Sequence, residues 1–140
     1  MNILFTTYSG LGVGGAETSM NLLAEGLRKF GHRVVIASTG EYEDGRKFRK
    51  IRKIPSYSIH NKYLQIFFSN IVKKEDIEII HSHDRLTSIP AIRAGKKLNI
   101  PVVVHFRDYW FAGPRSSCVA PDFTEYDKCS YSIILNKFPM

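Results

Sequence analysis

The sequence has too few cysteines and too short apolar runs for several common classes of protein. Its 140 residues include 2 cysteines, Cys118 and Cys129, which is too few for a disulfide scaffold, so we expect two free thiols in a reducing compartment. No apolar run approaches the roughly 20 residues that a membrane-spanning helix needs. The first residues, 1–6, show neither a basic leader nor a small-residue cleavage site. These absences predict a cytoplasmic protein.

Positive charge is abundant, but it is concentrated in one segment. The formal net charge is +7, from 20 basic and 13 acidic residues. A membrane or anion patch is predicted from six of these bases, without which the net charge would be +1: Arg46, Lys47, Arg49, Lys50, Arg52 and Lys53. Such a patch can hold phosphate, anionic lipid head groups or nucleic acid, and a solvated loop is the alternative interpretation.

Short apolar runs alternate with amphipathic segments along most of the chain, which is long enough for one domain. The runs predict strands at 3–7, 34–37, 54–59, 77–80 and 101–104. Helices are predicted from a glycine-rich turn to about residue 30, from 62 to 74 and from about 88 to 99. Strands that are apolar throughout, alternating with helices, predict an α/β fold: a Rossmann-like parallel sheet with helices on both faces. Residues 112–140 show no clear period and are predicted to be an irregular tail of the same domain.

Details of two helices follow from the side chains. In the first, Met20, Leu23, Leu27 and Phe30 recur at steps of three and four and predict a buried face, which Gly31 ends. In the third, Ser88 is the expected N-cap, with Pro90 in the first turn.

Ligands of open parallel sheets bind beyond the carboxyl ends of the strands. Three segments follow predicted strands directly: the loop 10–15, the pair His83 and Asp84, and the run 105–110. We expect all three at one edge of the sheet.

The loop contains a literal G-x-G-x-x-G pattern at Gly10, Gly12 and Gly15, which keeps an NAD- or FAD-binding Rossmann domain as an alternative. In that case the carboxylate of Glu41 would accept hydrogen bonds from the ribose hydroxyls. Against this interpretation, the carboxylate of Glu17 in the first helical turn would repel a pyrophosphate bound end-on to the helix.

Four motifs occur in a familiar order: Gly14-Gly15-Ala16-Glu17, then residues 31–35 (GHRVV), residues 80–84 (IHSHD), and Pro101-Val-Val-Val running into residues 108–111 (DYWF). Together they resemble the N-terminal half of family 4 glycosyltransferases, retaining enzymes with the two-domain GT-B fold. The resemblance covers about residues 2–115 and implies transfer of a sugar from a nucleotide-diphosphate sugar to a sugar or glycolipid acceptor.

The resemblance also implies a role for each matching residue. Gly14 and Gly15 would approach the donor diphosphate, and no metal or other cofactor would be required. Many relatives have a histidine just before the Asp-Tyr-Trp run, facing the reacting sugar. Here Arg107 stands in that place, so the catalytic set is either Arg107 itself or His105 two residues earlier, with Asp108 orienting Arg107 or capping a helix.

The remaining cleft residues are expected on the acceptor side: Glu17, His83, Asp84 and Tyr109. For Asp84 the alternative is that it begins the following helix, and for His81 and His83 the alternative is a purely structural role. His81 is expected to be buried and hydrogen-bonded. His81 and His83 also have a spacing that metal ligands can adopt, but the sequence indicates no third ligand. The resemblance implies a missing C-terminal donor-binding domain, so we expect the chain to be inactive alone. A basic module that docks on an anionic membrane surface or on nucleic acid is the other alternative, although no specific nucleic acid is expected.

Overall fold

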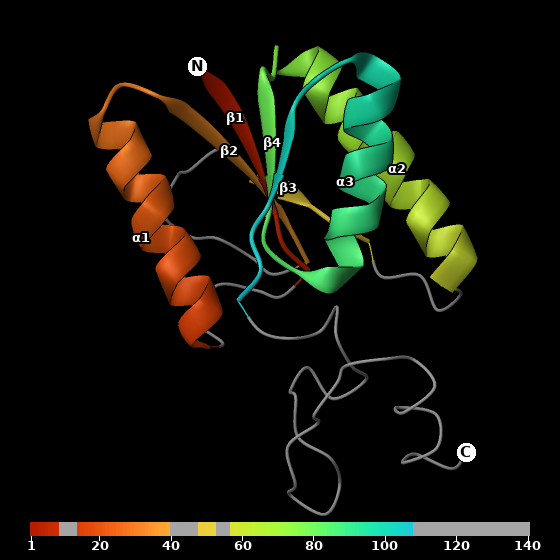
Figure 1. Ribbon diagram of the computed structural model, residues 1–140, viewed down its shortest axis with the longest axis horizontal. Coiled ribbons are helices and arrows are strands. Elements are labelled where there is room, and N and C mark those ends of the chain that lie inside the picture. The colour runs from red at the N-terminus through yellow and green to blue at the C-terminus, as the bar shows by residue number, and fades with distance from the viewer. Residues whose placement is uncertain (9–13, 40–47, 53–56, 108–140) are drawn as a thin grey trace, which may run out of the picture. The chain divides into compact units, whose positions relative to one another are not determined.

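The computed structural model describes residues 1–8, 14–39, 48–52 and 57–107 (Figure 1). The chain divides into two compact units, Met1–His105 and Phe106–Met140, and only Phe106 and Arg107 of the second unit are described. Several sequence-based predictions therefore fall outside the described residues: Gly10, Gly12, Glu41, Arg46, Lys47, Lys53, Asp108, Tyr109, Cys118 and Cys129.

The first unit is built on a sheet of five parallel strands in the order β3-β2-β1-β4-β5. The strands are β1 (Asn2–Thr6), β2 (Arg33–Ser38), β3 (Phe48–Lys50), β4 (Ile79–Ser82) and β5 (Val102–Val104). The order reverses beside β1, because β2 and β3 lie on one side of it and β4 and β5 on the other. This arrangement confirms the predicted α/β, Rossmann-like fold.

Three helices cover the two faces of this sheet: α1 (Gly15–Lys29), α2 (Tyr57–Lys74) and α3 (Arg85–Leu98). Figure 1 shows α1 on one face and α2 with α3 on the other, and all three helices begin at the edge where the strands end. Among the described residues, none of the helices has the length and apolar character that crossing a bilayer requires.

The core has two layers because successive strand residues point to opposite faces. Leu4, Val35 and Ile80 face α2 and α3, where they pack with residues such as Leu64 and Phe68. The alternate strand positions, Ile3, Phe5, Val34 and Ile36, face α1 and form a second cluster with Met20 and Ala24 of that helix.

The sequence-based boundaries are wrong around β3 and α2. The predicted strand at 54–59 is wrong over 57–59, which form the first turn of α2, and a strand occurs instead inside the basic segment, at Phe48–Lys50. The helical period explains the earlier start, since His60, Leu64 and Phe68 recur every four residues and are all buried.

The start of α3 also differs from the prediction. Asp84, not Ser88, is the N-cap, and its carboxylate accepts hydrogen bonds from the N–H groups of Leu86 (2.8 Å) and Thr87 (3.0 Å). Pro90 therefore lies inside the helix rather than in its first turn. Asp84 prevails because its side chain satisfies two N–H groups that the helix leaves open.

The buried face of α1 is narrower than predicted. Met20 and Ala24 are buried and Leu27 packs against their cluster, whereas Leu23 is 37% exposed and Phe30 83% exposed. Phe30 is the C-cap residue, so it no longer follows the helical stripe. Gly31 ends the helix as expected, with φ at 80°.

Candidate functional site

The ends of β1, β4 and β5 are joined by backbone hydrogen bonds at one edge of the sheet. The N–H of His83 donates to the carbonyl of Thr6 (2.9 Å), and the N–H of His105 donates to the carbonyl of Ser82 (2.8 Å). The N–H of Tyr8 donates to Oδ2 of Asp84 (2.5 Å). Parallel pairing thus brings His83, Asp84 and His105 together, as the sequence predicted.

Asp84 holds this edge together with both carboxylate oxygens. Oδ1 caps α3, and Oδ2 accepts from Tyr8 and from the hydroxyl of Thr87 (2.9 Å). Burial raises the pKa of Asp84 above its ordinary value, and these donors oppose part of that shift. The carboxylate is thus committed to the protein's own groups, and contact with acceptor hydroxyls stays a prediction.

Three imidazoles gather where β4 and β5 end. The ring centroids of His81 and His83 lie 4.2 Å apart, and that of His105 lies 5.6 Å from His81 and 5.5 Å from His83. Phe5 packs against His81 and His83, with centroids 5.0 and 4.6 Å away. His83 is the more buried of the pair at 7% exposed, and His81 is half-buried, which reverses the burial expected of them. The pairing of β4 with β5 adds His105 to the other two imidazoles, a third ring that the sequence analysis did not identify as a possible metal ligand.

Helix α1 begins at two glycines, Gly14 and Gly15, which have no side chains. Gly14 is the N-cap, with extended backbone and no side chain to cap the helix. A Cβ on Gly14 would lie 3.1 Å from Oε2 of Glu17, and a Cβ on Gly15 would meet none of the described atoms within 4 Å. Neither conformation nor packing among the described residues requires glycine at position 15. The carboxylate of Glu17 lies in the first turn, where the helix dipole favours an anion.

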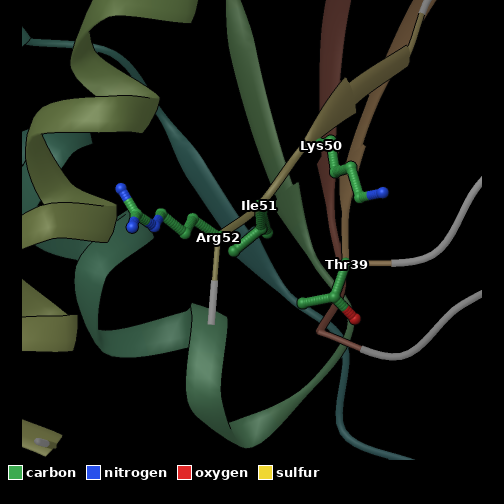
Figure 2. Close-up of a pocket in the computed structure, with 4 residues that line it drawn as sticks. All are labelled: Thr39, Lys50, Ile51 and Arg52. Atoms are coloured by element: carbon green, nitrogen blue, oxygen red, sulfur yellow. The ribbon is translucent and has the colours of Figure 1, made fainter. Parts of the chain in front are cut away.

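Half of the predicted basic patch is described. Arg49 forms an ion pair with Glu75, which is buried and also binds Arg33, so Arg49 joins β3 to the end of α2. Lys50 and Arg52 are exposed and line a cavity of about 400 Å³ with Thr39 and Ile51. Figure 2 shows the side chains of Lys50 and Arg52 pointing away from each other, so they do not converge on one anion.

Sequence reasoning missed His60, which lies next to Tyr8. The two ring centroids are 5.4 Å apart, His60 is 4% exposed, and neither ring nitrogen has a hydrogen-bond partner among the described residues. Burial lowers the pKa of His60 below its usual value. A polar residue at a core-facing helical position was the available signal.

Arg107, the residue that replaces the expected histidine, is partly buried and belongs to the second unit. Its predicted place beside His105 in a catalytic set stays a prediction, as do the roles of Gly14, Gly15 and Glu17.

Comparisons with known proteins agree with this fold. The family model described as Glycosyltransferase Family 4 matches residues 13–134. A solved glycosyltransferase from Rickettsia africae ESF-5 is 20% identical, with a TM-score of 0.63 over 74% of this chain and 28% of that one. The lipopolysaccharide outer core galactosyltransferase WaaB is 15% identical, with a TM-score of 0.63 over 92% and 36%.

A third structure, MurG from Acinetobacter baumannii, is 15% identical, with a TM-score of 0.59 over 90% of this chain and 42% of that one. The chain thus spans less than half the length of each of these three solved proteins. A search of curated protein sequences found no match. At these identities the structural likeness establishes the fold, not the chemistry.

Proposed function

Because the chain belongs to glycosyltransferase family 4, we propose that it forms the acceptor-side domain of a retaining glycosyltransferase that uses a nucleotide-diphosphate sugar. The observation that carries this proposal is the shared edge of β1, β4 and β5. There the N–H of Tyr8 donates to Asp84, and the N–H of His105 donates to the carbonyl of Ser82. This is the edge at which ligands of open parallel sheets bind.

Gly14 and Gly15 are proposed to receive the donor diphosphate. The N-terminus of a helix offers N–H groups and a positive dipole end to an anion. The open space beside Gly15 supports this role. Packing against the described residues leaves room for a side chain at this position, but a side chain would obstruct an approaching phosphate, whereas glycine does not.

His105 and His83 are proposed to face the sugar and the acceptor. In the transfer, the bond between the anomeric carbon and the diphosphate oxygen breaks, and the acceptor oxygen bonds to the same carbon. The acceptor's hydroxyl proton leaves toward the departing phosphate or a nearby base. Positioned donors stabilise the charge that develops on the diphosphate, and Arg107 with Asp108 is proposed to supply part of that stabilisation.

A second Rossmann-like domain is proposed to hold most of the nucleotide sugar. The coverage of the three solved proteins, 28% to 42%, supports a division of the work between this chain and further sequence. We expect no turnover from the 140 residues alone, and no metal requirement.

The exposed Lys50 and Arg52 support a further part of the proposal, namely contact with anionic head groups around a glycolipid acceptor. Vesicle sedimentation tests this part. Binding to anionic but not to neutral vesicles, weakened by salt and by the Lys50→Gln/Arg52→Gln double variant, is expected. Equal binding to RNA would indicate nonspecific electrostatics instead.

The central test is a titration of the isotopically labelled chain with UDP-glucose, GDP-mannose and NAD, followed by NMR. Saturable shifts at Gly14, Gly15, His83 and His105 with a sugar nucleotide are expected. Gly15→Ala should weaken them. Gly26→Ala is the matched control, since it makes the same change within α1 at another site where a Cβ meets none of the described atoms within 4 Å.

Two outcomes would contradict the proposal. Saturable binding of NAD at micromolar concentration, without an effect of sugar nucleotides, would favour the dinucleotide-binding alternative. Release of free nucleotide diphosphate from a sugar nucleotide by the chain alone would refute the need for a second domain.

A further inference from the structure

Backbone pairing alone brings three histidines to one place. His81 and His83 are two residues apart along an extended segment, so they share a face of the sheet. His81 is the register partner of Phe5 on one side and of Val103 on the other. The hydrogen bond from the N–H of His105 to the carbonyl of Ser82 then positions the backbone of His105, so that its imidazole lies beside the other two. Each ring is therefore attached to a strand or to its immediate end.

The separations suit a shared ion. One ring nitrogen from each histidine lies within 4.8 Å of the others. With Zn–N bonds of about 2.0–2.1 Å, the nitrogens of a tetrahedral site lie about 3.3 Å apart. The three atoms thus need to close by about 1.5 Å at most. Rotation of the side chains can provide this, since His105 lies beyond the last residue of β5 and is only partly buried.

The donor type selects the class of ion. Imidazole nitrogen favours Zn²⁺, Cu²⁺, Ni²⁺ and Co²⁺ over Mg²⁺, Ca²⁺ and Mn²⁺, which prefer oxygen. The carboxylate of Asp84 caps α3 and is occupied by four protein donors, so it is not counted among the ligands. The ring of Phe5 forms an apolar wall against His81 and His83, and the Nε2 atoms of both histidines are shielded from solvent.

We propose that His81, His83 and His105 bind one divalent transition-metal ion, with Zn²⁺ as the reference ion. Three protein ligands leave a fourth position for water or a small ligand. His83 and His105 are also the side chains proposed to face the sugar and the acceptor. Binding of the ion needs neither a nucleotide sugar nor a second domain, so its test and the test of the proposed function can fail separately.

The test uses the 140-residue chain without a histidine tag. Addition of Co²⁺ should produce the visible absorption of a tetrahedral site, saturating at one ion per chain, and Zn²⁺ should abolish it by displacement. In NMR spectra of the imidazole nitrogens, Zn²⁺ should shift three of the five histidines, with His32 and His60 unchanged.

Variants identify the ligands. His83→Gln and His105→Gln should each weaken Co²⁺ binding by about tenfold or more, since loss of even a supporting group costs that much at metal sites. His32→Gln is the matched control, because this histidine lies outside the cluster beside the N-terminal amine (3.3 Å). A Cys118→Ser/Cys129→Ser variant should also bind normally.

Absence of the Co²⁺ absorption would overturn the proposal. So would binding that survives both cluster variants, or that is lost with His32 or with the two cysteines. If His83→Gln fails to fold, His105→Gln still decides the matter, because His105 lies outside the strand and its replacement leaves the core intact.

Discussion

Asp84 is the residue whose replacement tests the described site most directly. Its carboxylate caps α3 and also accepts from the N–H of Tyr8, which follows β1 (2.5 Å). Asp84→Ala removes both functions. Loss of an N-cap costs about 1 kcal/mol, and a partly buried N–H without an acceptor costs about 1–2 kcal/mol more. The expected loss of unfolding free energy is therefore about 2–3 kcal/mol.

Asp84→Asn separates the two contributions. Asparagine is as good an N-cap as aspartate, so its amide oxygen can serve Leu86 and Thr87. Its NH₂ group then faces the N–H of Tyr8, donor against donor. The hydroxyl of Thr87 loses the same acceptor but can still donate to the carbonyl of Thr6 (3.3 Å). The expected loss is only the Tyr8 part, about 1–2 kcal/mol. The order of stability should be wild type, then Asp84→Asn, then Asp84→Ala.

Urea unfolding followed by circular dichroism measures this order. With slopes of about 1–3 kcal/mol per molar urea, Asp84→Ala should lower the midpoint by about 1 M without changing the slope. Asp76→Asn is the matched control, because Asp76 is exposed and its φ of 50° suits asparagine. Equal midpoints for Asp84→Asn and Asp76→Asn would refute the proposed link between Asp84 and Tyr8.

Three further predictions concern the frame of the site. Glu75→Gln should lower the free energy of unfolding by about 2 kcal/mol. This is less than for a fully buried ion pair, because the two arginine side chains that Glu75 binds are 39% and 32% exposed. In the same urea assay, Glu78→Gln at the surface should lower it by under about 1 kcal/mol. Gly95→Ala should destabilise the fold by about 1–3 kcal/mol, because its Cβ would lie 2.2 Å from the side chain of Val102. Gly26→Ala should stabilise the fold by about 0.5–1 kcal/mol, because its Cβ would meet none of the described atoms within 4 Å. Thermal unfolding in which both variants shift the midpoint in the same direction would contradict this. Burial lowers the pKa of His60, so the folded state favours the neutral ring. The wild type should therefore lose stability as the pH falls below about 6.5, and His60→Gln should lose less. Parallel dependence of stability on pH in the two proteins would contradict this role of His60.

The sequence predicted the sheet better than the helices. Apolar runs mark the four strands β1, β2, β4 and β5, because a strand covered on both faces is apolar throughout. Helical faces were less certain, since Leu23 and Phe30 have the right spacing yet stay exposed. Spacing identifies a possible stripe, but the width of the contact with the sheet depends on partners that the local sequence does not contain.

The candidate site was predictable where it depends on strand ends. His83, Asp84 and His105 follow strands directly, and their meeting follows from parallel pairing. The pairing of Arg33 and Arg49 with Glu75 was not predictable, because these residues are separated by 42 and 26 positions and carry no local pattern. Arg49 therefore looked like one more member of a basic patch.

The contact between Arg49 and Glu75 bears on how β3 keeps its alignment. A strand of three residues has few ladder bonds with which to resist slipping along β2. A slip of one residue would turn Arg49 to the opposite face of the sheet and separate it from the buried carboxylate. The ion pair between Arg49 and Glu75 thus favours one alignment of β3 with β2, and so short an edge strand adopts one register rather than several.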